Sequence, residues 1–437
     1  MNGKGQRLYS AARRLIPGGT QLLSKRPEMF LPEHWPSYYS RAKGAHVWDL
    51  DGNEYIDMGY SGIGACTLGA ADPDVDAAVK AAIDVGSMAT LNCPEEVELA
   101  ELLIELHPWA EMVRYARCGG EAMAIAVRIA RANTRRDKIA FCGYHGWHDW
   151  YLSANLADED QLDGQLLPGL EPAGVPRGLR GTALPFRYNQ LHELKAIAAA
   201  NPKELAAIIM EPVRSDEPAP HFLQEVRDIA SNLGAALIFD EVSAGFRLNT
   251  GGAHRVYGVE PDVAVFAKGM SNGYPMAAVI GRRDVMQAAQ STFISSTYWT
   301  ERIGPAAALA TIRKYQKHDV PKHLIRIGAR VQSGWRQIAE RAHVAVEVGG
   351  IPPLSHFAFQ GQQSQAAHTL FTQLMLDRGF LAGKAFYACY AHSAEDVDRY
   401  LAVSAEAFSL IGRALEQGTV IDMLQGPVAH SGFQRLA

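Results

Sequence analysis

The stretch that decides the fold is residues 205–240, LAAIIMEPVRSDEPAPHFLQEVRDIASNLGAALIFD. Its continuous apolar run, Leu205–Met210, predicts a strand buried on both faces. A helical stripe follows and stops at Gly234, a residue typical of helix ends. The apolar residues of that stripe are Phe222, Val226, Ile229 and Leu233. The run Ala236–Phe239 predicts the next strand, so the stretch as a whole predicts one βαβ unit of a parallel sheet.

The same alternation of helical periodicity and short apolar runs extends on both sides, from residue 73 to residue 315. We therefore expect an α/β domain over 73–315, with a further strand at Val263–Phe266. An N-terminal segment, residues 1–72, is expected to pack on the remaining domain and on a dimer interface. The C-terminal residues 316–437 predict a smaller α+β domain.

Composition narrows the class of protein. The chain has 437 residues, of which 48% are hydrophobic and 20% charged, as in ordinary globular enzymes. A net charge of −5 predicts neither a nucleic-acid partner nor an anionic membrane partner. The N-terminus has no apolar core typical of a signal peptide, and no apolar run approaches the ~18 residues of a membrane helix. Five scattered cysteines without a CxxC pair predict reduced thiols and a cytoplasmic location.

Charged residues follow three of the apolar runs. Glu211, Asp240 and Lys268 come directly after predicted strands, and the carboxyl ends of parallel strands form the usual site of such sheets. A lysine beside low-dielectric walls has a lowered pKa and suits Schiff-base chemistry; the alternative is a surface lysine at a strand end. A buried Asp240 needs a partner, either an arginine or a cofactor cation such as a protonated pyridine nitrogen.

Two glycines open a predicted helix. Gly119 and Gly120 precede apolar positions at Ile125 and Ile129, so the free N–H groups of that helix start are a candidate phosphate seat. The alternative is a tight turn. No GxGxxG follows a strand and no GxxxxGK[ST] is present, which disfavours dinucleotide and P-loop sites.

One aromatic and histidine cluster stands apart, Tyr144-His145-Gly146-Trp147-His148-Asp149. His145, His148 and Asp149 are metal ligands by type, but their spacing matches no HExxH pattern and no further group completes a set. We therefore expect no metal site. An aromatic lid over a planar cofactor fits the cluster better, and loop packing is the alternative.

In combination, these residues resemble the class III, fold type I pyridoxal-phosphate-dependent aminotransferases, within them the glutamate-1-semialdehyde aminomutase-like branch. The resemblance covers nearly the whole chain. It is carried by an ordered set of motifs: Pro17-Gly18-Gly19-Thr20, Val47-Trp48-Asp49-Leu50-Asp51-Gly52, Leu68-Gly69, Tyr144-His145-Gly146, Glu211-Pro212-Val213, Phe239-Asp240-Glu241-Val242, Gly245-Phe246-Arg247 and Lys268-Gly269. It implies a mostly parallel seven-stranded sheet flanked by helices, and pyridoxal 5′-phosphate as cofactor.

The resemblance also implies catalytic roles. Lys268 would form the internal aldimine and shuttle the proton, and Asp240 would pair with the pyridine nitrogen. Val242 would pack on one face of the ring and Tyr144 on the other. Glu211 would steady the site near Asp240 or the ring hydroxyl.

Phosphate binding is implied at Gly119 and Gly120 through their backbone N–H groups. Thr297 would reach the phosphate of a neighbouring subunit, which implies a homodimer with shared active sites. The family's Ser-Gly-Thr/Ser turn is replaced here by Cys118-Gly119-Gly120, so phosphate binding is expected to depend more on backbone groups and on Thr297.

For the substrate, the resemblance points to two arginines. Arg26, with Lys25 as the neighbouring alternative, corresponds to the arginine that meets the substrate carboxylate in the aminomutase branch. Arg214 is a second candidate for an anionic substrate group. No C-terminal arginine is found where many class III aminotransferases bind an α-carboxylate.

We therefore expect an aminotransferase that moves an amino group from an amine or amino-acid donor to a carbonyl acceptor through a pyridoxamine phosphate intermediate. A glutamate-1-semialdehyde 2,1-aminomutase is the alternative, and a catalytically inactive homologue is a third interpretation. The loop 156–181 is a candidate lid. Its acidic residues disfavour an anionic aminomutase substrate, and Tyr298-Trp299 departs from the aminomutase pattern. Those acidic residues are Asp158, Glu159, Asp160 and Asp163.

Overall fold

The computed structural model describes residues 3–158, 160–165 and 168–433, so Glu159 of the candidate lid lies outside the described residues. The chain divides into two compact units, residues 73–321 and residues 1–72 together with 322–437. Each is described by itself. The first unit ends at Pro321 rather than at Tyr315 because the helix that holds Tyr315, α10 (Ile303–His318), continues to His318.

The 73–321 unit is built on a seven-stranded sheet of order β4-β10-β9-β8-β7-β5-β6. Its strands are β4 (Met112–Ala116), β5 (Lys138–Cys142), β6 (Ala183–Pro185), β7 (Leu205–Met210), β8 (Ala236–Asp240), β9 (Val263–Phe266) and β10 (Ala277–Gly281). Only β10 runs antiparallel to its neighbours in this sheet. The predicted mostly parallel seven-stranded α/β fold is confirmed.

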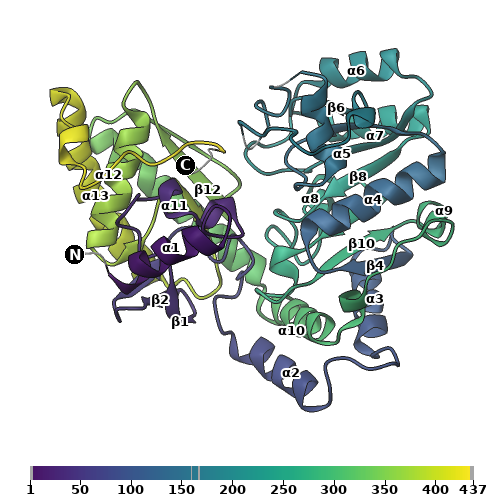
Figure 1. Ribbon diagram of the computed structural model, residues 1–437, viewed down its shortest axis with the longest axis horizontal. Coiled ribbons are helices and arrows are strands. Elements are labelled where there is room, and N and C mark those ends of the chain that lie inside the picture. The colour runs from purple at the N-terminus through teal and green to yellow at the C-terminus, as the bar shows by residue number, and fades with distance from the viewer. Residues whose placement is uncertain (1–2, 159, 166–167, 434–437) are drawn as a thin grey trace. The chain divides into compact units, whose positions relative to one another are not determined.

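Helices cover both faces of this sheet because its central strands are apolar on both sides. In β7, Ile209 packs into the cluster that contains α4 (Gly119–Thr134), whereas Ile208 and Met210 pack into the cluster of α7 (Phe222–Leu233). Figure 1 shows α4 and α7 beside the strands of this unit. Helix α7 ends at Gly234 with φ +59°, the left-handed conformation that was predicted there.

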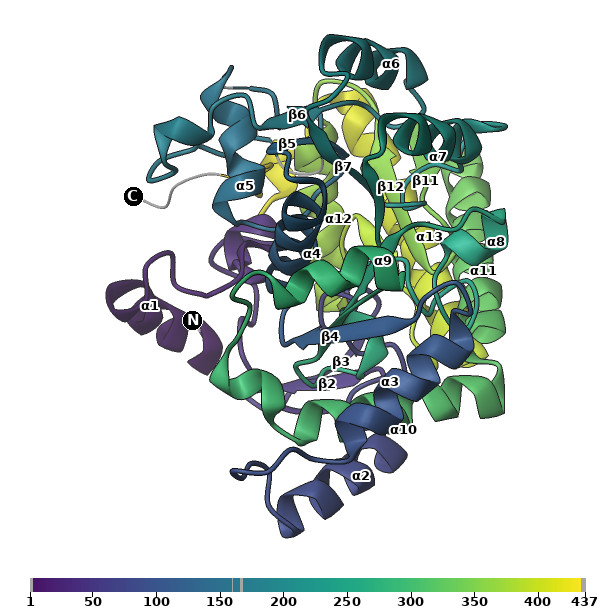
Figure 2. The same cartoon turned by 90° about the vertical axis from the view of Figure 1, so that its right-hand side faces the viewer.

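The remaining helices of this unit are short or lie beyond the sheet edge. Helix α10 packs on α2 (Pro73–Asp84) and α3 (Glu95–Leu106), as Figure 2 shows. The other helices are α5 (Asp149–Leu152), α6 (Leu191–Ala200), α8 (His254–Tyr257) and α9 (Arg283–Met286).

The other unit joins the two ends of the chain in one sheet. The hairpin of β2 (His46–Asp49) and β3 (Glu54–Asp57) is extended by the parallel strand β13 (Phe380–Leu381). The remaining elements are α1 (Lys4–Leu15), β1 (Tyr39–Lys43), β11 (Val346–Gly349), β12 (Leu354–Phe359), α12 (Ser364–Asp377), β14 (Ala385–Tyr387) and α13 (Ala394–Gln417). Helix α11 (Val320–Arg341) begins at the end of the first unit.

No helix among the described residues is both long and apolar enough to cross a membrane.

Candidate active site

Three strand ends of the 73–321 unit bring ionisable residues together. Asp240 is the last residue of β8, and Glu211 and Lys268 come one and two residues after β7 and β9, the neighbours of β8 in the sheet. Glu211 is 8% exposed and Asp240 3% exposed. The charges of both carboxylates act on the Lys268 amine. The convergence that the sequence predicted is therefore present at the carboxyl edge of the sheet.

The Lys268 amine is held in a polar but poorly hydrated position. Its Nζ donates a hydrogen bond to Ser243 Oγ at 2.8 Å. Burial, assisted by the positive charge of Arg214, lowers the pKa of Lys268 to about 8, although the two carboxylates act in the opposite direction. At pH 7 about a tenth of the amine is then neutral and nucleophilic, about two hundred times more than for a lysine with the ordinary pKa of about 10.4.

The partner of Asp240 is a histidine. Asp240 Oδ2 lies 2.7 Å from His145 Nδ1, and Asp240 Oδ1 accepts the Val242 N–H at 2.9 Å. His145 Nε2 lies 3.0 Å from the Cys142 carbonyl. Because a carbonyl only accepts, Nε2 carries a proton, and the Nδ1 contact shares one further proton with the aspartate. The buried Asp240 carboxyl group is thus held in place by His145 and Val242, and not by an arginine.

A small cavity opens beside Glu211. Arg214 Nη1 lies 3.2 Å from Glu211 Oε1 and 3.4 Å from Oε2. Burial raises the pKa of Glu211, with Arg214 acting against this and the charge of Asp240 adding to it. Both residues line a cavity of about 180 Å³ together with Gln165 and Tyr188. The lining of this cavity therefore includes both a carboxyl group, Glu211, and a guanidinium cation, Arg214.

The start of α4 forms a close-fitting backbone cradle. A Cβ at Gly119 would lie 2.9 Å from a Val242 methyl group, and Gly146 approaches Gly120 so closely that its Cβ would lie 3.0 Å from the Gly120 Cα. The Glu121 carboxylate accepts the N–H groups of Arg117 and Cys118. The first N–H groups of the helix itself have no acceptor within the helix and suit an anion.

Tyr144 lies between β5 and α5 and is partly buried. Its ring meets that of Tyr151 edge to face with 5.7 Å between centroids. Burial raises the pKa of the Tyr144 hydroxyl, so the phenol stays neutral at physiological pH. Like Val242, Tyr144 packs against the α4 side of the core.

Two further predicted residues belong to other segments of the chain. Thr297 is exposed in a short 3₁₀ turn, Thr297–Thr300. The end of that turn is fixed by Arg117, whose Nη2 donates to the Trp299 and Glu301 carbonyls at 3.1 and 2.9 Å. Arg26 belongs to the other unit, where its guanidinium lies against Gly18.

Three contributors were missed by the sequence interpretation. By residue type His145 is a metal ligand, and its position after the apolar strand β5 is the one sequence signal that links it to a strand-end site. Ser243 and Arg117 carried no signal, because their partners lie far along the chain. Among the described residues, no group of three or more Cys, His, Asp or Glu side chains could hold a metal.

A comparison with protein families decides the class. The model described as Aminotransferase class-III matches residues 32–390, which is most of the chain. The chain belongs to the class-III aminotransferase family. The predicted family, enzyme class and cofactor are confirmed: this class-III aminotransferase is a transaminase that uses pyridoxal 5′-phosphate.

Individual relatives of this class-III aminotransferase differ in named activity. It is 33% identical over 403 residues to a 3-aminobutyryl-CoA aminotransferase of Cloacimonas acidaminovorans, covering 89% of this chain and 93% of that protein. It is 34% identical over 438 residues to a glutamate-1-semialdehyde 2,1-aminomutase of Roseiflexus castenholzii, covering 95% of this chain and 99% of that protein. The solved internal-aldimine form of the FumI protein of Sphingopyxis sp. MTA144 superimposes with a TM-score of 0.86, with 26% identity and coverage of 95% and 98%.

The donor set fits pyridoxal phosphate. The free backbone N–H groups at the start of α4 suit a phosphate. A side chain at Gly119 would collide with Val242, so this position requires glycine. A buried carboxylate suits a protonated ring nitrogen, and an amine of lowered pKa suits a carbonyl carbon. Asp240 and Lys268 supply these two groups on neighbouring strands.

Proposed function

We propose that the carboxyl edge of β7, β8 and β9 is the catalytic site of this aminotransferase and that Lys268 carries its cofactor. The observation that carries the proposal is the partly buried Lys268 amine, bonded to Ser243 and one strand away from the Asp240–His145 pair. A solvated surface lysine would keep its ordinary pKa and would have no such neighbours.

Each ionisable group then has a chemical task. Bound pyridoxal phosphate supplies a conjugated ring that takes up the electron pair left when a proton leaves the substrate carbon. In its neutral form, Lys268 Nζ would accept that proton and hold it for return. Asp240, whose two carboxyl oxygens are fixed by Val242 and His145, would stabilise the protonated ring nitrogen and so favour the uptake of the electron pair.

Other residues would hold and orient the ring. Gly119 and Gly120 would bind the phosphate through their N–H groups, and Tyr144 and Val242 would contact the two faces of the ring. Glu211 would meet the ring hydroxyl or Asp240. Their placement around the strand ends and the α4 start supports these roles.

We further propose a homodimer in which Thr297 completes the phosphate site of the partner subunit. Support comes from a run of exposed apolar residues on the 73–321 unit. The Arg302 N–H donates to the Ser87 carbonyl at 2.9 Å, and Arg302 pairs with Glu95, so the two segments that carry most of these residues are tied together. The exposed residues are Ile83, Val85, Met88, Leu91, Val97, Phe293 and Tyr298.

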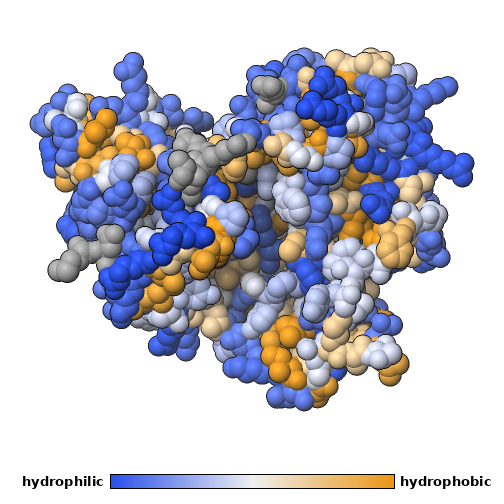
Figure 3. Space-filling view, viewed as in Figure 1, coloured by the Kyte–Doolittle hydropathy of each residue, from blue (hydrophilic) through white to orange (hydrophobic). Residues whose placement is uncertain are grey.

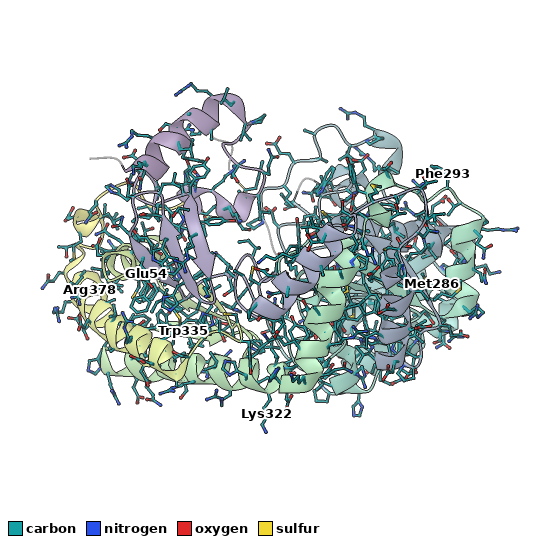
Figure 4. All side chains as sticks on the ribbon, turned by 90° about the horizontal axis from the view of Figure 1, so that it is seen from below. Glu54, Met286, Phe293, Lys322, Trp335 and Arg378 are labelled. Carbon is teal, nitrogen blue, oxygen red and sulfur yellow. The ribbon has the colours of Figure 1, made fainter. Side chains whose placement is uncertain are left out.

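Two of the figures show this surface. In Figure 3, hydrophobic residues gather where α2 and the loop after it lie in Figure 1. Figure 4 labels Phe293, which is 83% exposed, and Met286 of the nearby helix α9, which is only 2% exposed. Large apolar side chains that are exposed together are typical of a protein–protein interface.

Thr297→Val is expected to weaken pyridoxal-phosphate affinity by about tenfold to a hundredfold, the effect of losing one charge-assisted hydrogen bond. Equilibrium titration of the cofactor-free protein measures this. Thr300→Val is the matched control, because the Thr300 hydroxyl is already bonded to the Thr297 carbonyl at 3.0 Å. Unchanged affinity in Thr297→Val, or a monomeric loaded enzyme, would contradict the shared site.

For the substrate, we propose an anionic group bound by Arg26, Arg214 or both. Arg214 lines the cavity beside Glu211, so it is placed to meet a group that enters there. The planar guanidinium fork binds a carboxylate in a way that lysine does not reproduce.

Arg26→Lys is expected to raise KM, or to lower kcat/KM, by about tenfold, the loss of one strong hydrogen bond. The amine donor for this assay comes from a half-reaction screen that follows the cofactor absorbance. The cofactor spectrum should stay unchanged. Arg14→Lys, on the same N-terminal segment, is the control, and equal kinetics in both variants would return Arg26 to the role of a surface charge.

Amino transfer between two molecules is our main proposal, and intramolecular aminomutase activity is the second candidate, favoured by the 34% identity to a named aminomutase. Glutamate-1-semialdehyde supplied alone separates them. We expect one stoichiometric half-reaction that waits for a carbonyl acceptor. Rapid repeated conversion to 5-aminolevulinate would establish the aminomutase instead.

The cytoplasm remains the proposed location. All five cysteines are free thiols, which suits a reducing compartment.

A further inference from the structure

The short turn that carries Thr297 is held at its C-terminal end by one arginine. Arg117 Nη2 donates to the carbonyls of Trp299 and Glu301 at 3.1 and 2.9 Å, and Arg117 Nε lies 2.8 Å from Glu301 Oε1. The side chains of this ion pair are only 10% and 17% exposed. Such a pair opposes movement of the chain, because separating it would leave two poorly hydrated charges without partners.

The Glu301 carboxylate also fixes the chain on its other side. It accepts the N–H groups of Ile303 and Gly304 at 2.6 and 2.9 Å, and these are the first free donors of α10. Arg117 itself is the residue after β4, an edge strand of the seven-stranded sheet. The ion pair therefore joins the turn to two regular elements, β4 and α10.

Two further arginines hold the chain before Thr297. Arg128 of α4 donates from Nη1 to the Phe293 carbonyl at 3.0 Å, and Arg114 of β4 donates from Nη2 to the Ile294 carbonyl. Residues 295–298, which lie between these contacts and those of Arg117, are all exposed. The segment is thus fixed at both ends, and Thr297 lies in its exposed middle.

We propose that Arg117 is a positioning residue for cofactor binding in the partner subunit. By fixing the turn, it would keep the Thr297 hydroxyl where the phosphate of the partner's cofactor accepts its hydrogen bond. This inference rests on the shared phosphate site proposed above. An exposed turn without such contacts would sample many conformations, and ordering it upon binding would cost conformational entropy. Arg117 removes part of that cost before the cofactor binds.

The guanidinium group suits this task because its donors point in several fixed directions. Nη1 donates to the Ala116 carbonyl at 3.1 Å, so all three nitrogens of Arg117 contact the chain. A lysine ammonium has no such planar fork. The backbone N–H of Arg117 is bonded separately, to Glu121 at 3.1 Å. A substitution of the side chain therefore leaves this contact beside the Gly119 phosphate seat in place.

The test is the pyridoxal-phosphate affinity of the cofactor-free protein, measured by equilibrium titration in a cycle with Thr297→Val. We expect Arg117→Gln to weaken this affinity by about tenfold, and by no more than Thr297→Val does. In the Thr297→Val background, the same substitution should change the affinity by less than about twofold, because Arg117 acts through Thr297. A merely structural role would reduce the affinity in both backgrounds alike.

Arg227→Gln is the matched control. Arg227 Nη1 lies 2.8 Å from Asp262 Oδ2, and the side chains of that pair are 17% and 11% exposed, close to the values for Arg117 and Glu301. Its loss should leave the cofactor affinity unchanged. Thermal unfolding of each variant shows that it is folded. Glu301→Gln removes the same ion pair from the other side and is expected to repeat both results, so it decides the question if Arg117→Gln is unstable.

Two outcomes would overturn this inference alone: wild-type affinity in folded Arg117→Gln, or effects of Arg117→Gln and Thr297→Val that multiply in the double variant. In the second case Arg117 would act on the phosphate seat of its own subunit. Unchanged affinity in Thr297→Val would instead contradict the shared site, and this inference would fail with it.

Discussion

Replacing Lys268 with alanine is expected to abolish covalent attachment of the cofactor and to lower the transamination rate by more than about a thousandfold. A positioned acid–base group alone contributes roughly 10²–10⁴ in rate, and this variant also loses the nucleophile. Borohydride should fix pyridoxal phosphate to the wild-type chain but not to Lys268→Ala. Mass spectrometry of the reduced proteins measures the difference directly.

The variant should remain folded. Within the described residues the Lys268 amine makes one hydrogen bond, to Ser243, and its charged form is disfavoured by burial, so its removal costs little stability. The thermal unfolding temperature of the cofactor-free protein is the control. Lys203→Ala, at an exposed lysine just before β7, should behave as wild type in every assay. Cofactor that is still fixed to Lys268→Ala by borohydride would refute the assignment.

The lowered pKa of Lys268 adds a pH test of the same residue. Only the neutral amine captures the cofactor, and a pKa of about 8 means that the neutral form accumulates as pH rises through that value. The rate of capture by the cofactor-free protein should therefore rise with a midpoint near pH 8 and level off about one pH unit above it. A midpoint near the ordinary lysine value of about 10.4 would show that the amine is solvated.

The sequence was sufficient to predict the strands and helix that position the site. Leu205–Met210 became β7 with the same bounds, and the stripe that stops at Gly234 became α7. These elements can be predicted from the sequence because a strand buried on both faces must be continuously apolar. In addition, glycine adopts the left-handed conformation at a helix end without strain. The charged residues directly after such strands could be assigned to one edge for the same reason.

Contacts between distant segments could not be predicted. The partner of Asp240 is His145, 95 positions earlier, and periodicity could not choose between that residue and His148. Arg117 fixes the carbonyl of Glu301 across 184 positions, and β13 joins β3 from the other end of the chain. Such pairs depend on the three-dimensional path of the chain, and a single sequence holds no local signal for them.

The second large effect is expected at Asp240. Asp240→Asn should lower kcat by about two to nearly four powers of ten, because losing the charged partner of a buried cation costs roughly 3–5 kcal/mol and each 1.36 kcal/mol is a factor of ten in rate. The asparagine amide fits the existing hydrogen bonds. Its oxygen can accept the Val242 N–H, and its NH₂ can donate to His145 Nδ1, whose ring keeps its proton on Nε2 toward the Cys142 carbonyl. The fold should therefore persist, and the loss should be electrostatic.

That cause can be isolated with a cofactor analogue methylated at the ring nitrogen, which carries the positive charge without help from Asp240. If Asp240 acts by keeping that nitrogen cationic, the analogue should restore much of the activity of Asp240→Asn and should give wild type no comparable gain. Asp284→Asn, at an exposed aspartate of α9, is the matched control and should be neutral with either cofactor. Steady-state kinetics of the three proteins with both cofactors measure this. An Asp240→Asn variant that keeps full activity with pyridoxal phosphate would remove Asp240 from the ring nitrogen, whereas a large loss that the analogue does not restore would show that the carboxylate acts chiefly by orienting His145.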